Sequence, residues 1–128
     1  MPKKVLVIEV VEDEFAMTNA LVEKLKHHGF ETTSARNGEV GLTMALSEKP
    51  DLILLDIVMP VMDGMTMLQK LRASGDWGKK VPVILLTNLT ADDQILKGVA
   101  KYEPSYYLVK TNWTLEDVVQ KIKDCLGA

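Results

Sequence analysis

The stretch Pro50–Gly64, P-D-L-I-L-L-D-I-V-M-P-V-M-D-G, contains a short apolar run that stops on an acid. Leu52–Leu55 has the length and composition of a strand covered on both faces, as parallel strands are in α/β sheets. Asp56 follows, and a carboxylate at the end of a buried strand is costly unless it meets a cation, a donor or water. Pro60 excludes a continued strand, and Asp63-Gly64 predicts a turn into a helix. Asp56 is therefore either a plain turn residue or part of a ligand site.

The composition of the chain limits its class. At 128 residues, we expect one domain over residues 1–128 with no output domain. The net charge of −3 gives no basic surface for nucleic acid. Cys125 is the single cysteine, which excludes an internal disulfide and suits the reducing cytoplasm. No apolar run reaches the roughly 20 residues that a membrane helix needs.

Apolar strand patterns alternate with helical patterns along the chain. The predicted strands are Val5–Val11, Phe30–Ala35, Leu52–Leu55, Val81–Leu86 and Tyr106–Val109. Strict alternation predicts a parallel sheet with helices on both faces. Five such units favour an α/β, flavodoxin-like (βα)5 fold, a doubly wound five-stranded sheet in the order 2-1-3-4-5. The Thr-rich second strand is expected at an edge, residues 74–78 in a loop, and a capping box at Thr114–Asp117.

In this topology the strands end at one edge of the sheet with reactive or ionic residues. These are Glu12-Asp13, Asp56, Thr87 and Lys110. Three carboxylates close together repel one another unless a cation lies among them, and oxygen ligands suit Mg²⁺, or Mn²⁺ in its place. Asp56 can then act as a nucleophile toward a phosphoryl group, while Lys110 and the Thr87 hydroxyl stabilise its oxygens.

These motifs closely resemble the receiver domain of two-component response regulators, of the stand-alone, chemotaxis-regulator-like type. The resemblance rests on Glu12-Asp13, the L-L-D-I-V-M-P-V-M-D-G stretch around Asp56, Leu-Leu-Thr87 and Tyr-Leu-Val-Lys110. It implies that Asp56 accepts a phosphoryl group from the phosphohistidine of a sensor histidine kinase. The chain would then catalyse only its own phosphorylation and dephosphorylation, and would not otherwise be an enzyme.

The resemblance also implies a metal site and a switch. Asp13, Asp56 and the Val58 carbonyl would hold Mg²⁺, with Glu12 acting through water. On activation, Thr87 would shift toward the phosphoryl group and Tyr107 would turn inward. The surface of the fourth helix, fifth strand and fifth helix would then change for a downstream protein or phosphotransfer partner.

The sequence departs from the family pattern at three places. Thr111 follows Lys110 where the family has proline, and Asn88 stands where a small residue is common. Deleting Val10–Glu12 would leave an ordinary receiver start, so two registers of the first strand are possible. In one, Glu12-Asp13 is the acid pair and Glu9 lies inside the sheet. In the other, Glu9 ends the strand and the next three residues bulge outward. The first is favoured because it keeps the acid pair and its spacing to Asp56.

Three other functions are compatible with a fold of this class. A haloacid-dehalogenase-type phosphatase needs a second acid two residues after its nucleophile, where this chain has Val58. A flavodoxin needs a Ser/Thr-rich phosphate loop after the first strand, and none follows it. A pseudo-receiver that binds partners without phosphorylation remains open, because Asn88, Thr111 and the insertion could disable the chemistry while leaving the fold.

Overall fold

The computed structural model describes residues 3–8, 15–35, 37–55, 64–87, 106–109 and 114–127. Its described strands are β1 (Lys4–Ile8), β2 (Glu31–Ala35), β3 (Leu52–Leu55), β4 (Val83–Thr87) and β5 (Tyr106–Val109). Its described helices are α1 (Phe15–His27), α2 (Gly38–Glu48), α3 (Gly64–Arg72), α4 (Asp76–Lys80) and α6 (Leu115–Leu126). The strands form one parallel sheet in the order β2-β1-β3-β4-β5. The predicted flavodoxin-like architecture is confirmed.

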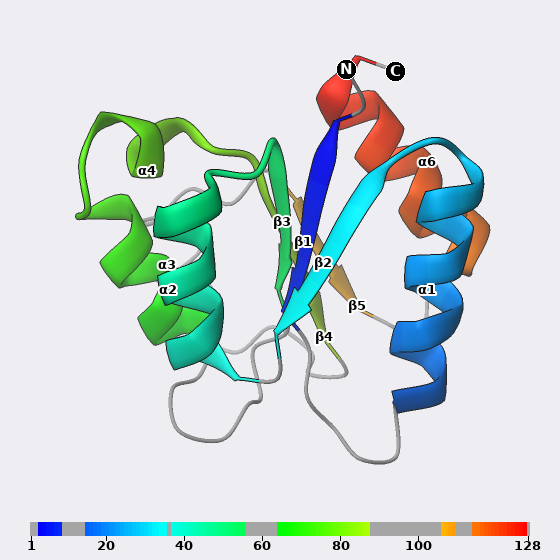
Figure 1. Cartoon of the computed structure of the whole chain (residues 1–128), viewed down its shortest axis with the longest axis horizontal. Helices are drawn as coiled ribbons and strands as arrows, with labels where there is room; N and C mark the ends of the chain where they lie inside the picture. Colours follow the sequence, from blue (N-terminus) through cyan, green and yellow to red (C-terminus); the bar gives the residue numbers. More distant parts are fainter. Residues whose placement is uncertain are drawn as a thin grey trace.

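Helices cover both faces of the sheet (Figure 1). Because side chains alternate along a strand, β3 supplies two separate cores. Ile53 and Leu55 pack on the side of α2 and α3, whereas Leu52 and Leu54 pack on the side of α1 and α6. All four side chains are at most 2% exposed. This burial confirms the prediction of a strand covered on both faces.

β1 lies between two other strands of the sheet. β2 lies at the edge of the sheet, as predicted, and β1 pairs with it and with β3. The predicted continuation of the first strand through Val11 falls outside the described residues. Within the described residues Ile8 is paired with Leu55. Glu9 and the acids that follow it lie outside the described residues, so the choice between the two registers of the first strand stays a prediction.

One short helix corrects the sequence interpretation. Residues 74–78 were expected to form a loop, but Asp76–Lys80 forms α4, and β4 begins at Val83 rather than Val81. The Arg72 guanidinium donates hydrogen bonds from Nη1 to the carbonyl oxygens of Gly78 (2.9 Å) and Val81 (2.7 Å), which ties α4 to the end of α3. Of the two glycines that suggested a loop, Gly78 is buried and has a packing role, whereas Gly75 is exposed and precedes α4 with a φ of 141°.

Gly78 is expected to tolerate no side chain. A Cβ at this position would overlap the Leu71 carbonyl oxygen and the Ser74 hydroxyl, which are hydrogen-bonded to each other at 2.6 Å. We expect Gly78→Ala to lower the free energy of unfolding by about 1–3 kcal/mol, the range for overpacking. Urea denaturation measures this loss. Lys79→Ala, on the exposed side of the same helix, is the matched control; equal midpoints for the two variants would contradict the prediction.

The capping box predicted for the last helix is confirmed. The Thr114 hydroxyl accepts a hydrogen bond from the Asp117 N–H (3.1 Å), and the Asp117 carboxylate accepts one from the Thr114 N–H (2.9 Å). The backbone and side chain of Thr114 lower the pKa of Asp117 below its ordinary value of 3.8. A carboxyl group whose pKa is lower in the folded state stabilises the fold above that ordinary value, and the stabilisation is lost as the pH falls through the folded pKa.

Removing half of this cap should therefore have a pH-dependent effect. We expect Thr114→Ala to cost about 1 kcal/mol of stability near neutral pH, as N-cap substitutions do. The cost should shrink as the pH falls through the folded pKa of Asp117, which lies below 3.8. Protonation then removes the interaction between Thr114 and the charged Asp117 carboxylate from the wild type too, so less is left for the substitution to remove. Thermal unfolding of both proteins across the acid range measures it. A cost that does not vary with pH would argue against the coupling of Thr114 to the Asp117 carboxylate.

Candidate functional site

The carboxyl ends of the strands meet at one edge of the sheet, and their pairing sets their relative heights. Ile8 at the end of β1 is opposite Leu55 at the end of β3, and Leu55 is opposite Leu85. β4 continues two residues beyond Leu85 to Thr87, which is opposite Val109 at the end of β5. At about 3.3 Å per residue, these last two strands reach roughly 7 Å farther along the sheet than Leu55.

The predicted site residues fall at or just beyond these ends. Thr87 is the last residue of β4, and Tyr107 lies in β5 opposite Leu85. Asp56 and Lys110 are the residues that follow β3 and β5 in the sequence. The described residues do not include Glu12, Asp13, Asp56, Val58, Asn88, Lys110 and Thr111. The pairing thus brings the strand ends that precede Asp56 and Lys110 to one edge, while the roles of the residues themselves stay predictions.

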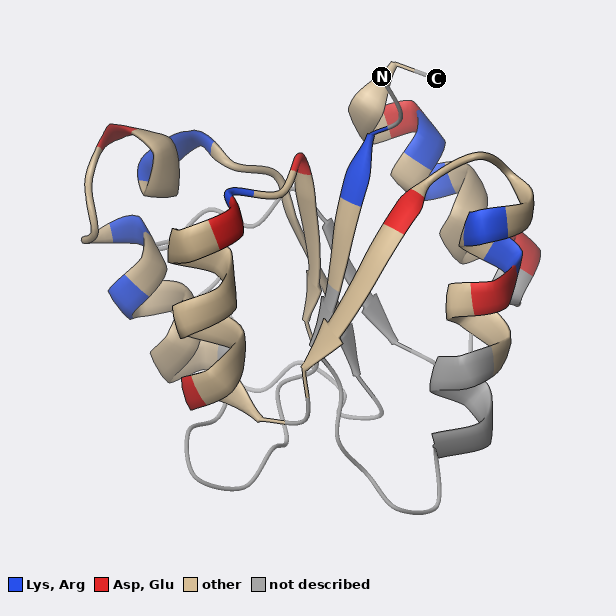
Figure 2. Ribbon diagram, viewed as in Figure 1, with Lys and Arg blue, Asp and Glu red and all other residues tan. Residues whose placement is uncertain are grey.

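The central strand β3, which ends at this edge of the sheet, is apolar and is paired on both sides. β3 pairs with β1 on one side and with β4 on the other, and Leu55 is 0% exposed. Among the described strand residues, the acidic and basic side chains are Lys4 and Glu31, both at the amino ends (Figure 2). Within the same described residues, no three His, Cys, Asp or Glu side chains gather where they could hold a metal ion. Any acidic metal site at the carboxyl edge must therefore draw on residues outside the described ranges.

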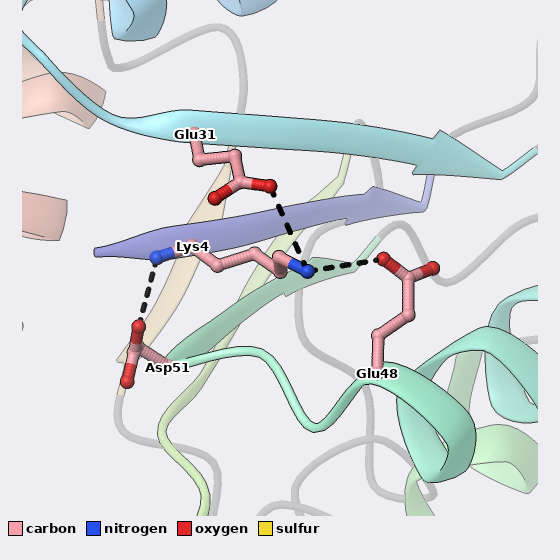
Figure 3. A network of polar contacts seen from close by, with 4 residues as sticks. All are labelled: Lys4, Glu31, Glu48 and Asp51. Atoms are coloured by element: carbon pink, nitrogen blue, oxygen red, sulfur yellow. Dashed lines mark hydrogen bonds and ion pairs between the residues drawn. The ribbon is translucent and has the colours of Figure 1, made fainter. Parts of the chain in front are cut away.

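A polar cluster that the sequence analysis missed lies at the opposite edge (Figure 3). The Lys4 N–H donates a hydrogen bond to Asp51 Oδ2 (2.8 Å), and the Asp51 N–H donates one to the Lys4 carbonyl oxygen (2.9 Å). Lys4 Nζ lies 3.4 Å from Glu48 Oε1 and 3.8 Å from Glu31 Oε1. The cluster joins β1 to β2, to α2 and to the residue before β3. Its place at the amino edge gives it a role in positioning β1 rather than in the chemistry.

α1 and α6, which cover the same face of the sheet, and the residue that follows α1 carry ionisable groups with shifted pKa values. Lys24 of α1 forms an ion pair with Glu116 of α6, and this contact lowers the pKa of Glu116. His27 and His28 are exposed at the end of α1, as predicted for a solvated helix end. Partial desolvation and nearby cations, chiefly Lys123, lower the pKa of His28. Burial raises the pKa of the Cys125 thiol, which disfavours its thiolate form.

The fold and strand-end pattern define a class, and comparison with known proteins defines the family. A five-stranded parallel sheet in this order is the doubly wound α/β class that binds ligands at the carboxyl edge. The family model described as the response regulator receiver domain matches residues 8–123. The chain belongs to this family of two-component signalling modules.

Individual relatives agree with this assignment. The response regulator MprA of Mycolicibacterium vanbaalenii is 30% identical over 128 residues, which is 98% of this chain and 51% of that protein. The chain thus spans about half the length of the curated relatives it matches. No helix in the described residues is long and apolar enough to cross a membrane.

Two solved structures show the same fold. A CheY-like receiver domain protein from Methanospirillum hungatei superposes with a TM-score of 0.86 at 24% identity, covering 99% of this chain and 95% of that one. The receiver domain of the sensor histidine kinase PA1611 from Pseudomonas aeruginosa superposes with a TM-score of 0.81 at 24% identity, with 100% of both chains covered. Its crystal structure has a magnesium ion coordinated in the active-site cleft.

Proposed function

We propose that this chain is the phosphoacceptor of a two-component phosphorelay and that Asp56 receives the phosphoryl group from a phosphohistidine of a sensor histidine kinase. The observation that carries the proposal is the family match over residues 8–123. The strand pairing supports it, because Asp56 and Lys110 each follow the last residue of a strand that ends at the same edge of the sheet.

The transfer is a displacement at phosphorus. A carboxylate oxygen of Asp56 attacks the phosphorus atom, the phosphorus–nitrogen bond of the phosphohistidine breaks, and the imidazole nitrogen leaves with the electron pair and takes up a proton. The ammonium group of Lys110 would balance charge on the transferred oxygens. Thr87 ends β4 two residues beyond the level of Leu55, which supports a contact between Thr87 and a phosphoryl oxygen carried by Asp56, the residue that follows β3 in the sequence. The chain would catalyse only its own phosphorylation and dephosphorylation.

The acids around Asp56 fit a hard divalent cation. Asp13, Asp56 and the Val58 carbonyl would hold Mg²⁺, with Glu12 contributing through water, and Mn²⁺ accepts the same oxygen ligands. When bound, Mg²⁺ supplies positive charge against the carboxylates and the phosphoryl oxygens. The magnesium ion in the receiver domain of PA1611 supports this choice of metal.

Phosphorylation would be relayed to a partner through β4 and β5. Thr87 and Tyr107 lie on adjacent strands, and Tyr107 is opposite Leu85, two residues before Thr87. A shift of Thr87 toward the phosphoryl group would alter the packing beside Tyr107 and the surface formed by residues 88–105, β5 and α6. A downstream protein or a phosphotransfer partner would read this change. The net charge of −3 and the unpaired thiol of Cys125 favour a protein partner in the cytoplasm over nucleic acid or a membrane.

Intact-mass measurement after incubation with acetyl phosphate tests the proposal. The wild type should gain one phosphoryl group in the presence of Mg²⁺ and none after chelation, and Asp56→Asn should gain none. Asp51→Asn is the matched control, because Asp51 precedes the same strand at its other end; it should be labelled like the wild type.

The outcome also decides the competing function. A folded wild type that gains no mass with Mg²⁺ present would refute phosphotransfer and leave the phosphorylation-independent pseudo-receiver as the function. Labelling of Asp56→Asn would show that another residue accepts the group.

A further inference from the structure

Asn37 and Gly38, at the start of α2, are the one asparagine–glycine pair of the sequence. An asparagine side chain can lose ammonia when the backbone nitrogen of the next residue attacks its amide carbon. A side chain on that next residue hinders the attack, and glycine has none. The other asparagines, Asn19, Asn88 and Asn112, precede alanine, leucine and tryptophan. The sequence therefore concentrates this reaction at Asn37.

In the folded chain, Asn37 is the N-cap residue of α2 and is held by two hydrogen bonds. Its side-chain Oδ1 accepts a hydrogen bond from the Val40 N–H (2.8 Å), and its carbonyl oxygen accepts one from the Gly41 N–H (2.9 Å). The first bond fixes the group that would be attacked, and the second fixes the peptide unit that contains the attacking nitrogen. Both bonds belong to the first turn of the helix.

The backbone conformation of Asn37 also opposes the attack. The reaction closes a five-membered ring, which needs the Asn37 Cβ and the Gly38 nitrogen to be nearly eclipsed about the Cα–C bond of Asn37. A ψ of 170° keeps these two atoms staggered. Gly38 and Gly41 are buried, so the Gly38 nitrogen cannot rotate toward the side chain while the first turn stays packed. The turn must therefore open before the ring can close.

We propose that Asn37 is a site of spontaneous deamidation and that opening of the first turn of α2 sets its rate. In the open turn the Gly38 nitrogen loses its proton and attacks the amide carbon of Asn37. The bond between Cγ and Nδ2 breaks, and ammonia leaves with a proton taken from water. A water molecule then opens the resulting succinimide at either of its two carbonyl carbons. The products are aspartate and isoaspartate at position 37.

The two products have opposite consequences for α2. An aspartate keeps an oxygen that can accept the Val40 N–H, and its charge is favourable at a helix N-terminus. An isoaspartate carries the main chain through the former side chain and leaves no side-chain oxygen in the capping position. The isoaspartate form should therefore unfold at a lower temperature than the unmodified chain, whereas the aspartate form should not.

Peptide mapping of the full chain by mass spectrometry, after incubation in native buffer and in urea, tests the proposal. The peptide that contains Asn37 should deamidate at least about tenfold faster in urea, where the cap is absent. Asn37→Ser keeps a capping oxygen and should show no mass gain in this peptide. Equal rates in the two solvents, no reaction at Asn37 in urea, or faster reaction at another asparagine would overturn the proposal.

A matched pair of variants separates opening of this turn from unfolding of the whole chain. Glu39 is exposed in the first turn of α2, and Glu23 is exposed in α1. Glycine weakens a helix by an amount that corresponds to about a fivefold change in an opening equilibrium. Glu39→Gly should speed deamidation in native buffer about fivefold, and Glu23→Gly less than about twofold.

In urea both variants should react at the wild-type rate, because neither substitution changes the Asn37–Gly38 pair. Equal acceleration of the two variants in native buffer would show that global unfolding sets the rate. That result, or an unchanged rate in Glu39→Gly, would overturn control by the first turn of α2.

Discussion

The pairing of β1 with β3 is the constraint on which the carboxyl edge depends. Both strands are central, with a neighbour on each side and helices over both faces. A slip of three residues is an odd slip and moves every side chain of β1 to the opposite face of the sheet. In a strand that is apolar on both faces this exchange alone would cost little. Lys4 favours the observed pairing, because its ammonium group lies within 3.8 Å of the Glu31 and Glu48 carboxylates.

The two edges of the sheet have different physical roles. At the amino edge, Lys4, Glu31, Glu48 and Asp51 form hydrogen bonds and ion pairs that are partly exposed, so each contributes modestly to stability. Their value is that they fix the height of β1 relative to β3. At the carboxyl edge the described strands end in apolar residues and in Thr87. The charges that the proposed chemistry needs would therefore come from the residues that follow the strands in the sequence.

The sequence predicted those parts of the fold that depend on local pattern. Leu52–Leu55 and Tyr106–Val109 were predicted with the bounds that the structure has, because each is an apolar run between strong interrupting residues. The register of β1 could not be predicted, because Val10 and Val11 continue the strand pattern beyond Glu9 and a pattern of period two does not fix an end. α4 was missed because glycine signals a turn in sequence, whereas Gly78 serves close packing. The cluster around Lys4 was missed because it joins residues up to 47 positions apart. The roles of Asp56, Lys110, Glu12 and Asp13 remain predictions from sequence.

The site requires a sharp change of environment within one residue. Leu55 is fully buried and paired with both neighbours, whereas Asp56, as the proposed phosphoacceptor, must be accessible to a kinase and to a metal ion. A longer buried strand would place Asp56 in the core, and a shorter one would remove paired residues that hold the chain just before Asp56. β4 and β5 run two residues farther than β3, so one side of the edge is raised. In the proposed function, the Thr87 hydroxyl and the Lys110 ammonium group would contact a phosphoryl group carried by Asp56. On that proposal, the greater length of β4 and β5 would favour contact with the phosphoryl group over contact with the free carboxylate.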